Sequence, residues 1–319
     1  MAAPVAEFVV AVDLGGTLAK VAHARPDGSS TPPTRVPTVR TDGQVSVPWL
    51  AELIAASTHA GPGERCVGYG VVVPGVIDVT AGVVRAAANV GWYDLPLREQ
   101  LEGLIGLVGA VGHDVRAGGL AEWRLGAGRG ATNLLFLPLG TGIAGAMVVD
   151  GRLLHADGYA GEIGHLPVPA GGDRACLCGQ AGCLETVSSA TGVTRSYALR
   201  TGEQVDARTV ADRARRGEMA ARAAFDLVVE GLLAALHAYC TLLGPETVVV
   251  GGGLAGAFDL FGERVEAGLA RQLTFQRSPA VVPARLGADA GVVGAGLVGW
   301  DRVQRSRSPM QQDQAEEER

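Results

Sequence analysis

One pattern occurs twice in the chain and constrains its fold more than any other feature: an apolar strand, a turn of glycine and threonine, and a second strand that ends in Asp-Gly. The first copy spans residues 7–28, with strands predicted at 7–13 and 18–24. The second copy spans residues 133–151, about 125 residues later, with strands predicted at 133–139 and 143–149. In each copy the short turn predicts that the second strand returns antiparallel to the first. The repeat indicates an internal duplication of this opening unit.

The other segments alternate between strand and helix patterns, which predicts an α/β chain. Strands are predicted at residues 66–73, 107–111 and 247–250, and helices at 47–59, 115–126, 207–243 (with a break near Gly217) and 291–303. The length of 319 residues suggests two domains. We expect residues 1–115 and the final helix in a smaller domain, residues 116–290 in a larger one, and a disordered tail at 304–319.

Composition excludes several classes of protein. Apolar residues make up 47% of the chain, so it is not a disordered protein. The net charge of −6 argues against nucleic acid as the main partner, because nucleic-acid-binding surfaces are basic. The N-terminus lacks a signal-peptide pattern, and the apolar runs are shorter than the about 20 residues of a membrane span. We therefore expect a cytoplasmic protein with no membrane or nucleic-acid partner.

Three glycine-rich turns that follow predicted strands suit phosphate binding. They lie at residues 15–17, 140–142 and 251–253. Glycine lets backbone N–H groups approach a phosphate closely, and the carboxylate of Asp13 suits Mg²⁺. A single such turn is equally typical of an ordinary hairpin. The three together favour a nucleotide site, with the metal and terminal phosphate at the first turn, the inner phosphates at the second, and the base and ribose at the third.

Asp114 follows a predicted strand and lies at the start of a predicted helix. A carboxylate in that position commonly caps the helix. It can also act as a general base that takes a proton from an attacking hydroxyl. The two roles are compatible, and the residue pattern leaves both open.

A histidine and three closely spaced cysteines form a candidate metal site. Cys176, Cys178 and Cys183 follow His165 in the pattern C-x-C-G-x-x-G-C. This donor set favours tetrahedral zinc over buried reduced thiols, and four protein ligands make the zinc structural. Glu162 and Glu185 flank the cluster, where they are either surface ion-pair partners or groups that hydrogen-bond the hydroxyls of a sugar.

These motifs together resemble the ROK family, the bacterial sugar kinases and related repressors of the hexokinase–actin superfamily. The resemblance covers residues 7–303 and rests on DLGGT (13–17), PGVID (74–78), the N-x-x-W-x-x-x-P-L segment (89–97), the Asp114 segment, LGTG (139–142), GEIGH (161–165) and the cysteine cluster that ends in Glu185. It implies two actin-like (ribonuclease H-like) lobes around a central cleft, with a zinc knuckle.

The resemblance implies an ATP-dependent kinase that phosphorylates the 6-hydroxyl of a hexose, with glucose as the first expectation. Asp114 is then the catalytic base, and His165 contacts both zinc and sugar. The substrate residues are Gly75, Asn89, His113, Glu162, His165 and Glu185. The Mg-ATP residues are Asp13, Gly15, Gly16, Thr17, Thr141, Gly142 and Gly252. The expected cofactors are ATP, Mg²⁺ and structural Zn²⁺, and the expected assembly is a homo-oligomer, either a dimer or a tetramer.

Three positions depart from the family pattern. His113 replaces the asparagine that normally precedes the catalytic aspartate and contacts the sugar. Leu18 replaces a lysine that many members carry, although Lys20 lies on the same face of the predicted strand. Ala144 and Ala146 replace glycines after LGTG and narrow the nucleotide loop. The sugar preference and the role of Lys20 are therefore open.

Alternative functions follow from the same residues. The substrate could be N-acetylmannosamine, N-acetylglucosamine, allose or a cyclitol, and the donor could be polyphosphate. A non-catalytic sugar sensor would keep the fold, but the intact Asp13 and Asp114 argue against it. A zinc hydrolase is disfavoured because four protein ligands leave no position for water. Only about a dozen residues precede Asp13, so we expect no DNA-binding domain of the repressor type.

Overall fold

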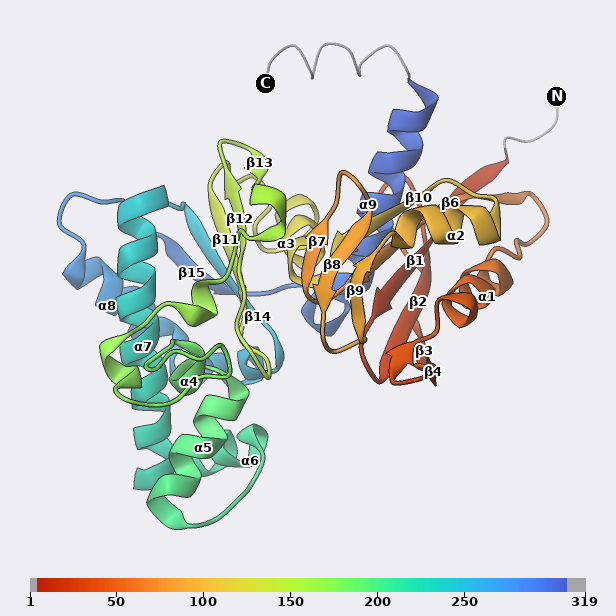
Figure 1. Cartoon of the computed structure of the whole chain (residues 1–319). Coiled ribbons are helices and arrows are strands. Elements are labelled where there is room, and N and C mark those ends of the chain that lie inside the picture. The colour runs from red at the N-terminus through yellow and green to blue at the C-terminus, as the bar shows by residue number, and fades with distance from the viewer. Residues whose placement is uncertain (1–4, 309–319) are drawn as a thin grey trace. The chain divides into compact units, whose positions relative to one another are not determined.

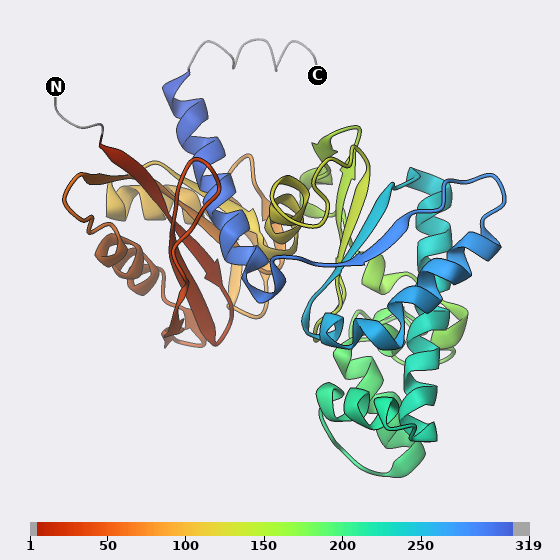
Figure 2. The ribbon, with the colours of Figure 1, turned by 180° about the vertical axis from the view of Figure 1, so that it is seen from behind.

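The computed structural model describes residues 5–308, which form two compact units (Figures 1 and 2). Unit 1 contains residues up to 121, residues 156–159 and residues from 289 onward. Unit 2 contains residues 122–155 and 160–288. No helix in the described part of the chain is both long and apolar enough to cross a bilayer.

The two units contain five-stranded sheets of identical topology. In unit 1 the strand order is β3 (Thr34–Pro37), β2 (Leu18–Ala24), β1 (Ala6–Leu14), β6 (Glu64–Val73), β10 (Gly109–His113). In unit 2 it is β13 (Arg152–Leu153), β12 (Ala146–Val149), β11 (Leu134–Pro138), β14 (Thr247–Gly251), β15 (Ala280–Pro283). In both sheets the central strand pairs antiparallel with the next strand of the chain and parallel with a later one. This correspondence confirms the internal duplication.

Strand β1 shows why the unit 1 sheet is covered on both faces. Successive side chains of a strand point to opposite faces. Val10 and Val12 belong to the cluster that includes α1 (Val47–Ser57) and α2 (Leu97–Ile105). Val9 and Ala11 belong to the cluster that includes α9 (Ala290–Arg307) and α3 (Asp114–Arg124). Two smaller sheets complete the unit: β4 (Arg40–Thr41) with β5 (Gln44–Val45), and β7 (Val76–Asp78) with β8 (Val83–Ala87) and β9 (Trp92–Leu95).

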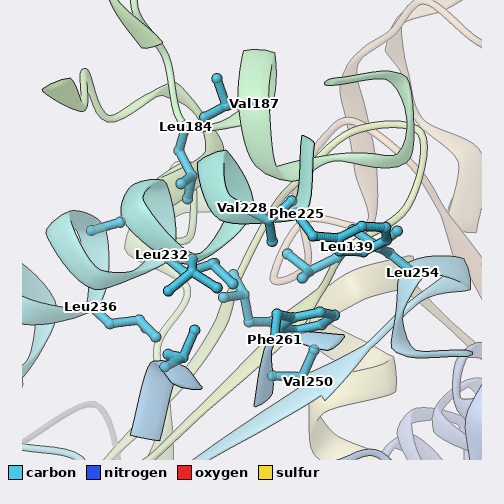
Figure 3. Close-up of a cluster of buried hydrophobic side chains, with 14 of the residues drawn as sticks. Leu139, Leu184, Val187, Phe225, Val228, Leu232, Leu236, Val250, Leu254 and Phe261 are labelled. Carbon is cyan, nitrogen blue, oxygen red and sulfur yellow. The ribbon is translucent and has the colours of Figure 1, made fainter. Parts of the chain in front are cut away.

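The core of unit 2 lies between its sheet and the long helix α7 (Met219–Leu243) (Figure 3). Leu232 and Phe225 of α7 pack in one cluster with Leu139, which follows β11, and Phe261, which precedes α8 (Gly262–Gln272). Burial of each such side chain contributes roughly 1.5–3 kcal/mol. The remaining elements of unit 2 are α4 (Glu185–Ser188), α5 (Ala190–Thr201), α6 (Ala207–Arg215), and short 3₁₀ turns at 163–165, 169–171 and 253–260. A further 3₁₀ turn at 156–158 belongs to unit 1, and one at 287–289 lies where the chain passes from unit 2 to unit 1.

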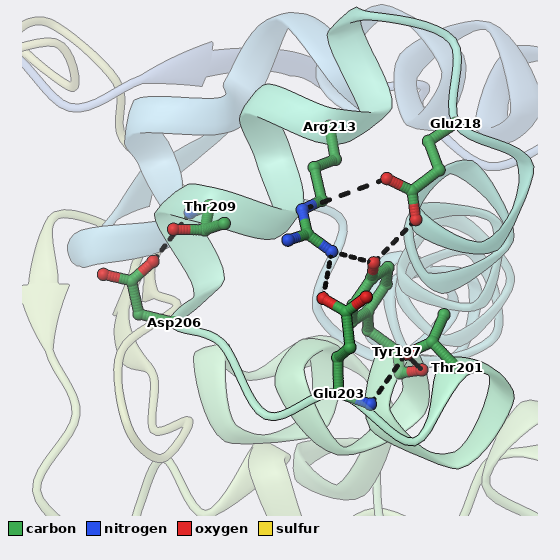
Figure 4. A network of polar contacts seen from close by, with 7 residues as sticks. All are labelled: Tyr197, Thr201, Glu203, Asp206, Thr209, Arg213 and Glu218. Carbon is green, nitrogen blue, oxygen red and sulfur yellow. Dashed lines mark hydrogen bonds and ion pairs between the residues drawn. The ribbon is translucent and has the colours of Figure 1, made fainter.

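A network of charged and phenolic groups connects α5, α6 and the start of α7 in unit 2 (Figure 4). Tyr197 of α5 donates a 2.6 Å hydrogen bond to Glu218, which precedes α7. Arg213 of α6 donates to Glu203 over 2.6 Å and also to the oxygen of Tyr197. The break between α6 and α7 falls at Gly217, as predicted, where the backbone has a φ of +94°.

Two predicted elements differ from the structure. The strand predicted over residues 143–149 begins only at Ala146, because the N–H groups of Ile143 and Gly145 bond to Glu185 and to the carbonyl of Gly161. The helix predicted at 291–303 continues to Arg307, so the start of the predicted disordered tail is helical. Basic residues in a last helical turn are favoured by the helix dipole. Residues 309–319 of that tail lie outside the described residues.

Candidate active site

Three parallel strands of unit 1 end at one edge of the sheet and bring predicted site residues together. Asp13 lies near the end of β1, Gly75 follows β6, and Asp114 directly follows β10. The register pairs Asp13 with Val72, and Val72 with Gly112. Ligands of α/β proteins bind outside the carboxyl ends of parallel strands. The edge of the unit 1 sheet is therefore a candidate ligand-binding edge.

Asp114 is a carboxylate whose surroundings favour proton acceptance. It is the first residue of α3, and its Oδ1 accepts a 2.7 Å hydrogen bond from the N–H of Val115. The surrounding protein removes water from the carboxylate and thereby raises its pKa above the usual range. The side chain keeps 32% of its surface accessible, so a substrate can still reach it. A higher pKa makes a carboxylate a stronger base.

His113 caps helix α3 through one ring nitrogen. Its Nδ1 accepts a 3.3 Å hydrogen bond from the N–H of Arg116, three residues further on. The side chain is only 8% exposed, and this burial, with a smaller effect of Arg116, lowers its pKa to about 3. The ring is therefore neutral near pH 7 and carries its hydrogen on Nε2. It offers a donor there, whereas an asparagine amide offers both a donor and an acceptor.

Lys20 supplies the positive charge beside Asp13. The two residues are directly opposite in the β1–β2 ladder, and the Lys20 Nζ lies 3.6 Å from Oδ2 of Asp13. The same ammonium lies 3.9 Å from Asp289, which precedes α9. Burial raises the pKa of Asp13, Lys20 lowers it, and Asp114 raises it further. Leu18 is 38% exposed, so a neutral side chain stands where many family members carry lysine.

The first glycine turn, residues 15–17, contacts the turn that carries Asn89. This turn connects β8 and β9, and Gly16 lies against it: a Cβ at Gly16 would be 2.5 Å from the carbonyl oxygen of Asn89. Only glycine fits such an approach. The structure thus brings the predicted phosphate-binding residues Gly15, Gly16 and Thr17 next to a predicted sugar-binding residue within unit 1.

The second glycine turn, residues 140–142 at the carboxyl end of β11 in unit 2, contacts Glu185. The Oε2 of Glu185 accepts a 2.8 Å hydrogen bond from the N–H of Ile143. A Cβ at Gly142 would lie 2.6 Å from the same oxygen. Glu185 is also the first residue of α4, where its carboxylate is favoured by the helix dipole. A predicted sugar-binding residue therefore touches the loop of Thr141 and Gly142.

The third glycine turn follows β14, the parallel neighbour of β11. Its Gly252 has a φ of +76° and packs on Leu139, whose carbonyl accepts a bond from the N–H of Leu254. A cavity of about 410 Å³ adjoins this turn and has Gly253 and Arg215 in its lining. Asp259 holds Arg215 through two hydrogen bonds of 2.6 and 2.9 Å.

The four predicted zinc ligands converge in unit 2. One ligand atom of each of His165, Cys176, Cys178 and Cys183 lies within 4.8 Å of the others. The Sγ atoms of Cys178 and Cys183 are 3.7 Å apart, and Nδ1 of His165 is 3.6 Å from Sγ of Cys176. Tetrahedral zinc, with Zn–S near 2.3 Å and Zn–N near 2.0 Å, requires ligand separations of about 3.6–3.8 Å. Both the donor set and the spacing fit zinc.

Glu162 lies beside this cluster, with its Oε2 3.8 Å from Nε2 of His165. If Nδ1 of His165 ligates zinc, Nε2 must carry the ring hydrogen, and this nitrogen faces the carboxylate of Glu162. Glu162 and His165 therefore form a polar pair next to the metal-binding loop.

Sequence reasoning missed two charged residues that organise these loops. Arg40 donates to the backbone carbonyls of three separate turns in unit 1. Glu122 of unit 2 is fully buried, and its carboxylate accepts N–H bonds from Ala127, Arg285 and Leu286 at 2.9, 3.1 and 2.6 Å. Neither residue stands in a recognisable motif, because most of its partners are backbone groups far along the chain.

Comparison of the sequence with known protein families and proteins gives matches over almost the whole chain. The model of the ROK family matches residues 9–299. A glucokinase of Halalkalibacterium halodurans is 33% identical over 313 residues, covering 91% of this chain and 94% of that protein. An N-acetyl-D-glucosamine kinase of Vibrio atlanticus is 29% identical over 300 residues, covering 90% and 97%.

Solved structures give the same result. The crystal structure of a ROK family glucokinase from Streptomyces griseus, in complex with glucose and AMPPNP, matches with a TM-score of 0.75 and 27% identity. The match covers 92% of this chain and 99% of that one. The predicted actin-like α/β fold is thereby confirmed.

Proposed function

The chain belongs to the ROK family, as its motifs predicted, and its relatives identify it as a sugar kinase; on that basis we propose that it transfers the γ-phosphoryl group of ATP to the 6-hydroxyl of glucose. The observation that carries this proposal is the edge of the unit 1 sheet. There Asp114, a carboxylate of raised pKa, follows β10, and Asp13, paired with Lys20 of β2, lies near the end of β1; both of these parallel strands flank β6.

Asp114 would act as the general base. It accepts the proton of the 6-hydroxyl while the sugar oxygen bonds to the γ-phosphorus and the bond to the ADP oxygen breaks. Asp13 is the residue that would hold Mg²⁺, directly or through water, and the ion would supply charge neutralisation on the phosphates. Lys20 adds a second positive charge at this position. Catalysis then rests on positioning and electrostatics, as in other phosphoryl transfers.

Each unit contains three of the residues that we propose to bind sugar. Gly75, Asn89 and His113 belong to unit 1, and Glu162, His165 and Glu185 belong to unit 2. The hydrogen bond from the Ile143 N–H to Glu185 supports the assignment of Glu185 to the site. It holds this proposed sugar-binding carboxylate beside the glycine turn at 140–142, the proposed phosphate loop. Structural zinc on His165 and the three cysteines would hold the loop of Glu162 and Glu185 in place.

The proposed nucleotide residues follow the three glycine turns. Gly15, Gly16 and Thr17 would contact the terminal phosphate, and Thr141 and Gly142 the inner phosphates. Gly252 and the cavity beside it would receive the ribose and base, since this cavity adjoins the turn after β14. We further propose a cytoplasmic homo-oligomer; light scattering of the purified protein measures its mass in solution.

A second substrate class is favoured by one observation. Because Nδ1 of His113 is engaged with Arg116, the residue offers only a donor to the sugar. This differs from the usual asparagine and would alter the preference among hexoses, including N-acetylhexosamines such as the substrate named for the Vibrio atlanticus kinase.

A panel assay tests the proposal. Glucose, mannose, allose, N-acetylglucosamine, N-acetylmannosamine and a cyclitol are supplied separately with Mg-ATP, and sugar-dependent ADP release is measured. A parallel series replaces ATP with polyphosphate and measures sugar phosphate. We expect the highest kcat/KM for glucose with ATP. Release of ADP that no sugar stimulates would contradict the proposed activity, and a higher kcat/KM for another sugar would replace glucose as the substrate.

A further inference from the structure

The carbonyl groups of the first phosphate loop all bond to one short segment, residues 38–40. Thr38 donates from Oγ1 to the carbonyl of Gly15 and from its N–H to that of Thr17, both at 3.0 Å. Arg40 donates from Nε to the carbonyl of Gly16 at 3.2 Å. Three successive carbonyls are thus fixed by two residues, so the orientation of the loop depends on this segment.

The other two nitrogens of Arg40 reach neighbouring turns. Nη1 donates to the carbonyl of Gly43 at 2.5 Å, and Nη2 donates to the carbonyl of Asn89. Because the carbonyl of Asn89 lies against Gly16, the phosphate loop and the sugar turn meet where this guanidinium bridges them. A planar fork of five N–H donors can serve three carbonyls at once, which a lysine ammonium does with poorer geometry.

The turn that carries Asn89 is also bonded to the hairpin that carries Arg40. The N–H of Val45 donates to the carbonyl of Val90 at 2.8 Å, and the indole of Trp92 donates to the carbonyl of Val45 at 2.8 Å. Val90 and Trp92 are buried. The hairpin and the turn therefore form one packed body, and Arg40 connects that body to the phosphate loop.

We propose that Arg40 is a positioning residue that couples sugar binding at the Asn89 turn to donor binding at the Gly15–Thr17 loop. A sugar that orders Asn89 also orders its carbonyl, and through the guanidinium it orders Gly16. By linkage, a bound donor then strengthens sugar binding by the same factor. This inference rests on the proposed kinase function and adds to it a route by which the two substrates influence each other.

Calorimetry of glucose binding, with and without Mg-AMPPNP, measures the coupling. In the wild type we expect AMPPNP to tighten glucose binding by about fivefold or more. In Arg40→Met we expect this factor to approach 1, with kcat/KM lowered by about 10- to 100-fold, because small misplacements of reacting groups have effects of this size. Arg40→Lys keeps the charge and should give intermediate values; it also serves if Arg40→Met fails to fold.

Two further variants separate coupling from a merely structural role. Thr38→Val removes only the bond to Gly15, so it should raise KM for ATP while glucose affinity without nucleotide stays unchanged. Arg25→Met removes an exposed arginine of unit 1 that pairs with Glu64 and should change neither constant. A coupling factor of 1 in the wild type, or an unchanged factor and kcat/KM in both Arg40 variants, would overturn the proposal. The panel assay on wild type tests the kinase function separately.

Discussion

The two copies of the duplicated strand–turn–strand element have the same topology, but only the first carries charged side chains of its own beside the turn. In unit 1 Asp13 precedes the turn, and Lys20 lies seven positions after Asp13. The corresponding positions in unit 2 are Pro138 and Gly145. The unit 1 loop thus carries a carboxylate and an ammonium 3.6 Å apart, whereas the unit 2 loop presents backbone and the oxygen of Glu185.

This difference indicates that two loops of the same topology are suited to different tasks. Charged groups beside the first loop suit a metal ion and a reacting phosphate. An uncharged loop braced by a carboxylate and a nearby zinc site suits binding and orientation. The charged groups beside the first loop should therefore control the rate of the chemical step, and the second loop with the Cys/His cluster should act on affinity. Substitutions in the two units separate these effects.

Asp114→Asn should have the largest effect, because an amide cannot accept the proton of the attacking hydroxyl. Loss of a general base lowers kcat by about 10²–10⁴-fold. Glucose affinity, measured by calorimetry, should remain close to that of the wild type. Asp226→Asn, an exposed ion-pair partner in unit 2, is the matched control and should leave kcat unchanged. Near-normal turnover of Asp114→Asn would remove this residue from the mechanism.

Cys178→Ser should act on affinity and stability. Loss of one ligand should lower zinc affinity by at least about 10- to 100-fold, and the metal-free loop should bind glucose more weakly and unfold at lower temperature. Elemental analysis, KM for glucose and Tm measure the three effects. Cys66→Ser in unit 1 is the control and should retain one zinc per chain. Absence of zinc from unchelated wild-type protein would contradict the assignment.

Lys20→Met should lower kcat by about tenfold, since one lost charge interaction of about 1.4 kcal/mol corresponds to that factor. It should also shift the acidic side of the pH profile of kcat. Burial raises the pKa of Asp13 and Lys20 opposes this rise. Removal of the ammonium therefore raises the pKa of Asp13 further, so that activity is lost at a higher pH as the solution is acidified. The double variant Leu18→Lys, Lys20→Met tests whether lysine at the usual family position restores the profile.

His113→Asn should have the smallest effect, a shift among sugars of up to about tenfold, the size expected for one hydrogen bond. The amide adds an acceptor that the neutral ring lacks at Nε2. We expect kcat/KM for glucose to rise relative to the other hexoses of the panel. An identical sugar profile in both proteins would show that His113 serves only as the cap of α3.

Sequence reasoning succeeded where the information is local and failed where it is not. The Gly/Thr turns and the α/β class follow from residue types at short spacing, and the four side chains predicted to bind zinc do converge. The bonds of Arg40 to Gly16 and Asn89 join residues 24 and 49 positions apart, and no motif encodes them. Likewise, the late start of β12 depends on Glu185, more than 40 positions away.

The side-chain assignments around the first loop show the same limit. The strand alternation predicted that Lys20 lies on the same face as position 18, but it could not predict which residue the Lys20 ammonium contacts. The β1–β2 register decides this point by setting Lys20 opposite Asp13. His113 was predicted from family alignment to face the sugar, and only the structure reveals that one of its nitrogens is already used by Arg116.

Identification of the product tests the central claim most directly. Wild-type enzyme is incubated with Mg-ATP and either glucose or 6-deoxyglucose, and the products are examined by ³¹P and ¹H NMR. The account predicts one phosphomonoester with glucose, its phosphorus coupled to the C6 protons, and no sugar phosphate with 6-deoxyglucose. A phosphorylated product from 6-deoxyglucose, or hydrolysis of ATP to free phosphate with neither sugar modified, would contradict transfer to the 6-hydroxyl.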